Sequence, residues 1–110
     1  AAIIFYGDSP GLKRDVTSCV PTRINPNAGH GCSTSVDEQK ILQHEFASFA
    51  RNISRSLPST YYFERWPLYC GVHTCGALIP GTCTVAFRDH EHLSSAGMAY
   101  SAPFLCRFME

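Results

Sequence analysis

The hydrophobic and polar positions of the chain fall into blocks that predict three strands and a C-terminal helix. Residues 1–6 form a continuous apolar run, which is typical of a strand buried on both faces. Residues 60–63 are aromatic and β-prone, and residues 82–88 are apolar again, so these ranges predict a second and a last strand. Residues 95–108 predict a helix that Pro103 should kink or split, because proline lacks the backbone N–H donor.

A long helix is predicted between the first two strands. Ser35 and Glu38 have the spacing of a capping box, and Pro58 ends the pattern. Apolar side chains recur between them at helical period and should pack on a sheet: Leu42, Phe46, Phe49, Ile53 and Leu57. Strand, helix and strand in this order predict a parallel crossover, so we expect the α/β class.

Composition narrows the class of protein. A chain of 110 residues makes at most one domain, and 45% hydrophobic residues suffice for a packed core. Nine basic and nine acidic residues cancel, so nothing indicates a nucleic-acid or anionic membrane partner. No apolar run approaches the roughly 20 residues of a membrane span. The opening residues lack a basic leader, so an exported protein would carry its targeting element elsewhere.

Six cysteines in so short a chain indicate an oxidising compartment and a disulfide-stabilised domain. The turn-rich range 12–35 is long and needs an anchor of that kind. Zinc is an alternative, because Cys70, His73, Cys75 and Cys83 are suitable ligands. A disulfide-tied hairpin accounts for more of this segment, so we expect no metal and no cofactor.

The stretch after the last predicted strand carries the candidate chemistry. Asp89 precedes His92 by three residues, so a turn can bring the carboxylate to one ring nitrogen of the imidazole. The other ring nitrogen is then fixed as a base, which a serine nucleophile requires. The spacing alone favours a solvated polar turn, with Ser94 or Ser95 capping the next helix.

The block Asp89-x-x-His92-Leu93-Ser94-x-x-Gly97 resembles the last sequence block of the SGNH hydrolase family. It is especially similar to the extracytoplasmic SGNH domains fused to membrane acyltransferases of family 3, which O-acetylate bacterial surface polysaccharides. The cysteine pair Cys70 and Cys75 and the apolar strand with a glycine–proline turn and Cys19 also fit those domains. The resemblance spans most of residues 1–110.

The resemblance implies a parallel-sheet, three-layer, flavodoxin-like SGNH fold, with this chain as the C-terminal portion of a single domain. It implies O-acyl transfer or ester hydrolysis on a polysaccharide, with His92 as general base and Asp89 as its partner. The protein would be periplasmic or otherwise extracytoplasmic and tethered to a membrane acyltransferase domain. Together with sequence proximity it favours the disulfides Cys19–Cys32 and Cys70–Cys75, which leaves Cys83–Cys106 by elimination.

Ser9 presents a second possibility, because Gly-Asp-Ser after a strand is also how the SGNH nucleophile block begins. We favour Ser9 as a turn residue, since Pro10 removes the following backbone N–H and the later Gly-x-Asn-Asp block is missing from the sequence. The nucleophile and oxyanion donors would then come from a preceding segment or a separate chain. The alternative function is a non-catalytic, disulfide-stapled module that binds polysaccharide or protein.

Overall fold

The computed structural model describes residues 2–13, 19, 23–24 and 32–110. Most of the turn-rich range 12–35 therefore lies outside the described residues, as does Ala1. The elements follow in this order: β1 (Ile3–Tyr6), β2 (Thr34–Ser35), α1 (Val36–Ser56), β3 (Thr60–Phe63), the 3-10 helix η2 (Trp66–Tyr69), β4 (Thr74–Cys75) and α2 (Ser95–Met109).

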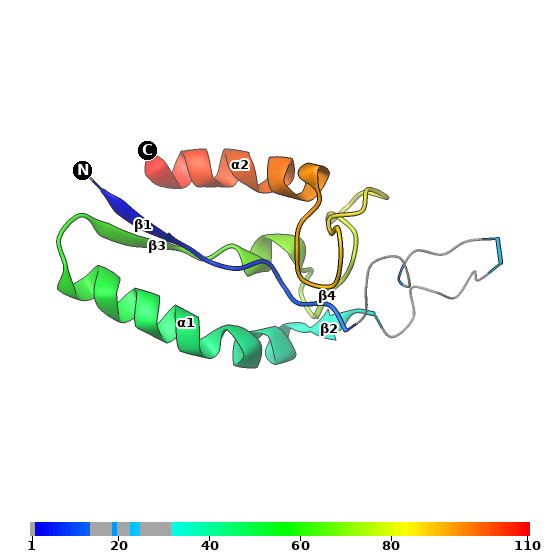
Figure 1. Cartoon of the computed structure of the whole chain (residues 1–110), viewed down its shortest axis with the longest axis horizontal. Coiled ribbons are helices and arrows are strands. Elements are labelled where there is room, and N and C mark those ends of the chain that lie inside the picture. The colour runs from blue at the N-terminus through cyan, green and yellow to red at the C-terminus, as the bar shows by residue number, and fades with distance from the viewer. Residues whose placement is uncertain (1, 14–18, 20–22, 25–31) are drawn as a thin grey trace.

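The strands β1 and β3 form a two-stranded parallel sheet, in which Ile3 lies opposite Thr60 and Tyr6 opposite Phe63. The helix α1 connects them, which confirms the predicted parallel crossover and the α/β class. The strands β2 and β4 pair antiparallel over two residues each. This small second sheet lies at the start of α1 (Figure 1).

The two helices lie on opposite sides of the parallel sheet (Figure 1). Phe5 of β1 contacts Phe49 of α1 with ring centroids 6.0 Å apart, and Tyr62 of β3 contacts Phe46 of the same helix. Phe63 faces the other way, and its ring centroid lies 5.2 Å from that of Phe108 in α2. Neighbouring strand residues therefore contact different helices, because successive side chains of a strand point to opposite faces of the sheet.

The prediction that the first strand is buried on both faces is wrong. Ile3 is 59% exposed and Tyr6 is 39% exposed. In the part of the chain that the structure describes, β1 pairs with β3 alone, so one of its edges has no neighbouring strand. A sheet of two strands is also narrow, so the helix on each face leaves part of the strand side chains exposed.

The helix α1 begins as predicted, with Ser35 as N-cap accepting a hydrogen bond from the backbone N–H of Glu38 at 3.0 Å. Its predicted apolar face is largely uncovered, however, because Leu42 is 67% exposed and Phe49 is 55% exposed. Buried positions of this helix are instead Gln39 and two small alanines, Ala47 and Ala50. The helix therefore packs on the sheet as predicted, through Phe46 and Phe49, but the expected burial of the whole apolar stripe is wrong.

The main apolar cluster lies beyond the carboxyl end of the parallel sheet. It consists of Leu12, Tyr69, Ile79, Ala86 and Phe87. Residues 82–88, predicted as the last strand, contribute to this cluster without forming a strand. They take part only in isolated bridges, such as Leu78 with Val85.

A tight turn explains why the predicted last strand does not form. Gly81 has a positive φ of 77°, and Thr82 donates both its backbone N–H and its hydroxyl to the carbonyl of Ile79. The chain therefore reverses at Pro80 and Gly81, and Ala86 donates its N–H to Ala77 across the reversal. Residues after this turn therefore pair back onto residues 77–79 and not with the parallel sheet.

The helix α2 continues from Ser95 to Met109 through Pro103, so the predicted split does not occur. Two of the three predicted disulfides are present, Cys19–Cys32 and Cys70–Cys75. The third pairing is wrong, because Cys83 and Cys106 are free and exposed. They belong to different parts of the fold, Cys83 to the turn after Gly81 and Cys106 to the last turns of α2.

Candidate functional site

The turn that carries Asp89 and His92 is closed by its own backbone. Phe87 and Leu93 form an antiparallel bridge, and Arg88 donates its N–H to the carbonyl of His92 at 2.7 Å. Inside this turn, one carboxylate oxygen of Asp89 accepts the backbone N–H groups of Glu91 at 2.9 Å and of His92 at 2.8 Å. An aspartate that bonds backbone donors two and three residues ahead fixes the turn and its own side chain together.

The other carboxylate oxygen of Asp89 lies 2.8 Å from Nδ1 of His92, which is the contact expected from the sequence. A carboxylate can only accept, so Nδ1 carries the proton and Nε2 of the neutral ring is the basic nitrogen. No described residue contacts Nε2, and the His92 side chain is 57% exposed. The imidazole is therefore oriented at one nitrogen and accessible at the other.

The charge of Asp89 is stabilised mainly by the backbone. The N–H groups of Glu91 and then His92, followed by the His92 side chain, hold the pKa of the Asp89 carboxyl well below its usual range. Hydrogen bonds to the ionised form dominate here, since the carboxyl is open to water. Asp89 therefore remains an anion and can stabilise a positively charged imidazole beside it.

Ser9 lies close to this turn but does not point its proton at the imidazole. Its hydroxyl donates to the carbonyl of Glu91 at 2.8 Å, and the residue is 7% exposed. Leu12 adds a second link by donating its N–H to the carbonyl of His90 at 2.7 Å. The segment after β1 and the turn of Asp89 and His92 are thus fastened together, which is the structural role that the sequence favoured for Ser9.

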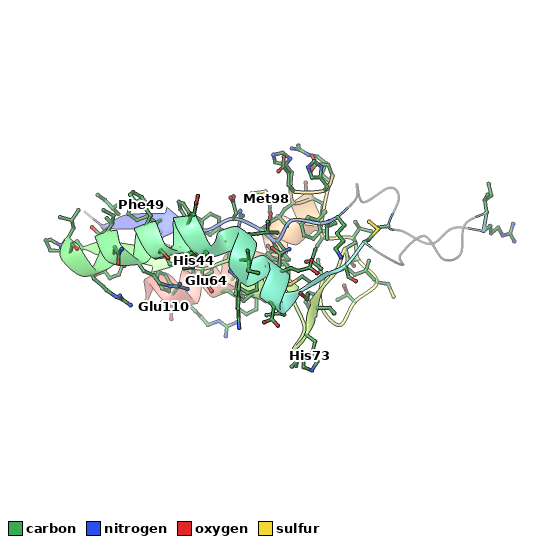
Figure 2. The ribbon with its side chains drawn as sticks, turned by 90° about the horizontal axis from the view of Figure 1, so that it is seen from below. His44, Phe49, Glu64, His73, Met98 and Glu110 are labelled. Carbon is green, nitrogen blue, oxygen red and sulfur yellow. A yellow bond between two sulfur atoms is a disulfide. The ribbon has the colours of Figure 1, made fainter. Side chains whose placement is uncertain are left out.

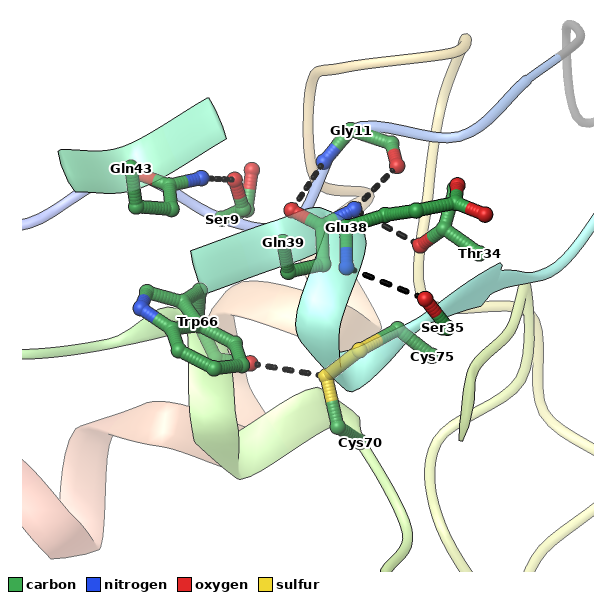
Figure 3. Close-up of a disulfide and its surroundings, with 10 residues drawn as sticks. All are labelled: Ser9, Gly11, Thr34, Ser35, Glu38, Gln39, Gln43, Trp66, Cys70 and Cys75. Carbon is green, nitrogen blue, oxygen red and sulfur yellow. Dashed lines mark hydrogen bonds between the residues drawn. A yellow bond between two sulfur atoms is a disulfide. The ribbon is translucent and has the colours of Figure 1, made fainter. Parts of the chain in front are cut away.

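Two glutamines of α1, which the sequence did not single out, hold the segment after β1 in place (Figure 3). Gln39 is fully buried; its amide nitrogen donates to the carbonyl of Gly11 at 2.6 Å and to the hydroxyl of Thr34 at 2.7 Å. Gln43, one turn later, donates to the carbonyl of Ser9 at 3.3 Å. The signal in the sequence was a polar residue at a helix position that faces the core, because a buried amide there needs hydrogen-bond partners.

The rest of the sequence block explains how α2 is attached to the turn. Ser94 caps α2 by accepting from the N–H of Gly97 at 3.1 Å, and its hydroxyl donates to the carbonyl of Val85 at 3.0 Å. A Cβ on Gly97 would lie 2.1 Å from the carbonyl oxygen of Ala86, so only glycine permits this approach. The serine and the glycine of the block are therefore needed for packing.

A cavity of about 350 Å³ lies where these segments meet. Asp8, Ser9 and Gly11 line one side, and Leu42 and Gln43 of α1 line another. The turn contributes Glu91 and His92 to the same cavity. The accessible imidazole thus borders a space in the size range of small-molecule sites.

Soft metal ligands are not gathered anywhere in the described residues. Cys70 and Cys75 are bonded to each other, and no group of three or more His, Cys, Asp or Glu side chains in that part of the chain could hold a metal ion. The described helices likewise include none that is long and apolar enough to cross a membrane. No family model, curated protein or solved structure matches the chain.

Proposed function

We propose that this chain supplies the acid–base half of a Ser–His–Asp site for O-acyl transfer or ester hydrolysis on a bacterial surface polysaccharide. The observation that carries the proposal is the 2.8 Å contact between Asp89 and Nδ1 of His92 at the border of a cavity. The substrate class comes from the resemblance of the Asp89 to Gly97 block to the polysaccharide-acetylating SGNH domains. On this proposal the sheet belongs to a three-layer SGNH-type fold, of which the chain is the C-terminal portion.

His92 acts first as a base and then as an acid. Its Nε2 takes the proton of a serine hydroxyl while the serine oxygen forms a bond to the acyl carbonyl carbon. The ester C–O bond then breaks, and the imidazolium returns the proton to the leaving alcohol. Water or a sugar hydroxyl releases the acyl group by the same proton transfers, giving hydrolysis or transfer. Throughout, Asp89 holds the ring tautomer and stabilises its positive charge.

The serine nucleophile comes from another segment or chain. Ser9 is unsuited to the role, because its proton is donated to the carbonyl of Glu91 and Pro10 provides no N–H for an oxyanion. The partner would also cover apolar surface that this chain leaves open on one face of α1, where Leu42, Phe46 and Phe49 are 67%, 40% and 55% exposed. Contiguous exposed apolar side chains are typical of surfaces that another protein segment covers.

The proposal places the protein outside the cytoplasm, in the periplasm or at the cell surface, tethered to a membrane acyltransferase domain. Two disulfides support an oxidising compartment. The membrane tether rests on the resemblance alone. It predicts that the native polypeptide carries a membrane acyltransferase domain ahead of this one.

The decisive experiment measures acetate release from an O-acetylated polysaccharide by the complete domain, that is, this chain together with the segment that bears the nucleophile. Replacing His92→Ala or Asp89→Asn should lower kcat by about 10²–10⁴-fold, the usual contribution of a positioned acid–base group and its partner. His90→Ala is the matched control, since it removes the neighbouring imidazole and leaves the Asp89–His92 pair in place. Full activity in the His92 variant would refute the proposal.

Ser9→Ala tests the source of the nucleophile in the same assay. We expect activity to remain within a few-fold, with a modest loss of stability from the broken bond to Glu91. A loss as large as that of His92→Ala, in a folded variant, would assign the nucleophile to Ser9 instead.

A binding module is the second candidate, and the exposed apolar face of α1 favours it. In that case the partner-completed domain would bind polysaccharide or protein without releasing acetate. Asp89→Asn would then leave the affinity unchanged.

A further inference from the structure

A second cavity, of about 300 Å³, lies between α1 and the segment that follows β3. The side chains around it that matter here are Lys40, Gln43, His44, Arg51, Glu64 and Trp66. Ala47, which is 4% exposed, lies at its wall and leaves room that a longer side chain on this turn would fill. Figure 2 shows His44 and Glu64, which lie on two different segments of the chain, at this side of α1.

The charges around this cavity do not cancel. Arg51 forms an ion pair with Glu64 and lies over the ring of Tyr62, 5.6 Å from its centroid. Lys40 and His44, one helical turn apart on α1, contact no charged or hydrogen-bonding partner among the described residues. The cavity therefore has one uncompensated ammonium group and a free imidazole, which together suit an anionic ligand.

Trp66 adds an aromatic surface to these donors. It is 6% exposed, and the small part that is open borders the cavity. Its indole N–H donates to no described residue, while the opposite end of the residue packs toward the disulfide, with the Cys70 sulfur 3.4 Å from the Trp66 carbonyl oxygen (Figure 3). An aromatic edge with a polar handle suits a ligand that presents both C–H groups and oxygens.

The two cavities adjoin, because Gln43 lines both of them. Its amide nitrogen donates to the carbonyl of Ser9, which also lines the cavity at His92. A chain of sugar units with one unit at His92 could therefore extend into the second cavity. The volume, at the low end for ligand sites, fits a single ring.

We propose that this second cavity binds a carboxylate-bearing sugar unit of the polysaccharide, adjacent to the unit whose ester reacts at His92. The inference rests on the proposed function for its substrate class and deepens it by naming the neighbouring unit. Lys40 and His44 hold the carboxylate, the exposed edge of Trp66 contacts the ring, and the Arg51–Glu64 pair offers a donor and an acceptor to sugar hydroxyls.

Trp66 is the chain's only tryptophan, so its fluorescence reports on this cavity. We expect D-glucuronate to change the emission saturably, with D-glucose and acetate each binding at least tenfold more weakly. Replacing Lys40→Gln should raise the Kd for glucuronate about tenfold, the effect of losing one hydrogen bond to a charged group. Lys13→Gln is the matched control, because Lys13 pairs with Glu38 outside this cavity, and its Kd should not change.

Three results would overturn the inference: no saturable response to glucuronate, equal affinity for glucose or acetate, or an unchanged Kd in the Lys40 variant. The fluorescence assay measures binding and needs no turnover. Its result is therefore independent of the proposed reaction. His92→Ala should abolish acetate release and leave the Kd for glucuronate unaltered. If glucuronate does not bind but the enzyme is active and depends on His92, only this inference is rejected.

Discussion

Gln39 offers the sharpest test of how the segment after β1 is held beside the turn of Asp89 and His92. Its side chain is fully buried and makes two hydrogen bonds to Gly11, at 2.6 and 3.3 Å, and one to Thr34 at 2.7 Å. Replacing Gln39→Ala removes all three. The backbone groups of Gly11 and the hydroxyl of Thr34 are then left in a site from which water is largely excluded.

The size of the effect follows from these contacts. An ordinary hydrogen bond contributes about 1 kcal/mol net, and a buried group left unpaired costs about 1–3 kcal/mol. Two short bonds and one long bond therefore give a loss of roughly 2–4 kcal/mol in the free energy of unfolding. Domains of this size are stable by only about 5–15 kcal/mol, so the change would be a large share of the total.

Urea unfolding followed by the fluorescence of Trp66 measures this loss. With an m value of about 1.5 kcal/mol/M, the midpoint should fall by about 2 M. Gln39→Met, which keeps the volume without the amide, should lose nearly as much if hydrogen bonds rather than filled space dominate. Gln43→Ala, with a single 3.3 Å bond, should lose less than about 1 kcal/mol. Wild-type stability in the Gln39→Met variant would refute the reasoning.

Four further outcomes can be measured on the isolated chain. Gly97→Ala should destabilise it by several kcal/mol, about 3 or more, because the new methyl group meets backbone 2.1 Å away; a loss below 1 kcal/mol in thermal unfolding would contradict that close approach. The carboxyl of Asp89, followed by ¹³C NMR, should titrate below the ordinary value of 3.8, so its contribution to stability is present above that pH and is lost as the pH falls through the lowered pKa. Replacing His92→Ala should leave most of that lowering, since backbone N–H groups are its main cause, and a return to the ordinary value would disprove this. Thiol titration of the denatured, unreduced chain should find the two thiols of Cys83 and Cys106, whereas none would mean that they pair in solution.

Local signals in the sequence predicted local structure well. The Ser35–Glu38 capping box starts α1, and the aromatic run Thr60–Phe63 is the strand β3. The contact between Asp89 and His92 was also foreseeable, because the two residues are three positions apart in one turn. These features depend on chemistry within a few positions of the chain.

Features that depend on distant neighbours were not predictable in this way. The apolar stripe of α1 indicated a helix correctly, but periodicity does not say which protein surface covers Leu42 or Phe49. The run before Asp89 was mistaken for a strand because its apolar residues are buried in an irregular cluster instead. The role of Gln39 required knowing that Gly11 and Thr34 meet at one point, although they lie far apart in the sequence.

The way Asp89 is anchored has a consequence for when the chemistry becomes possible. Its carboxylate is held by peptide groups of the same four-residue turn, so the groups that orient the imidazole all lie within that turn. If His92 is the proton acceptor, as proposed, it is ready before the rest of the centre has assembled. On the proposed function, arrival of the serine-bearing segment is the event that switches on turnover, and no rearrangement of the base has to follow it.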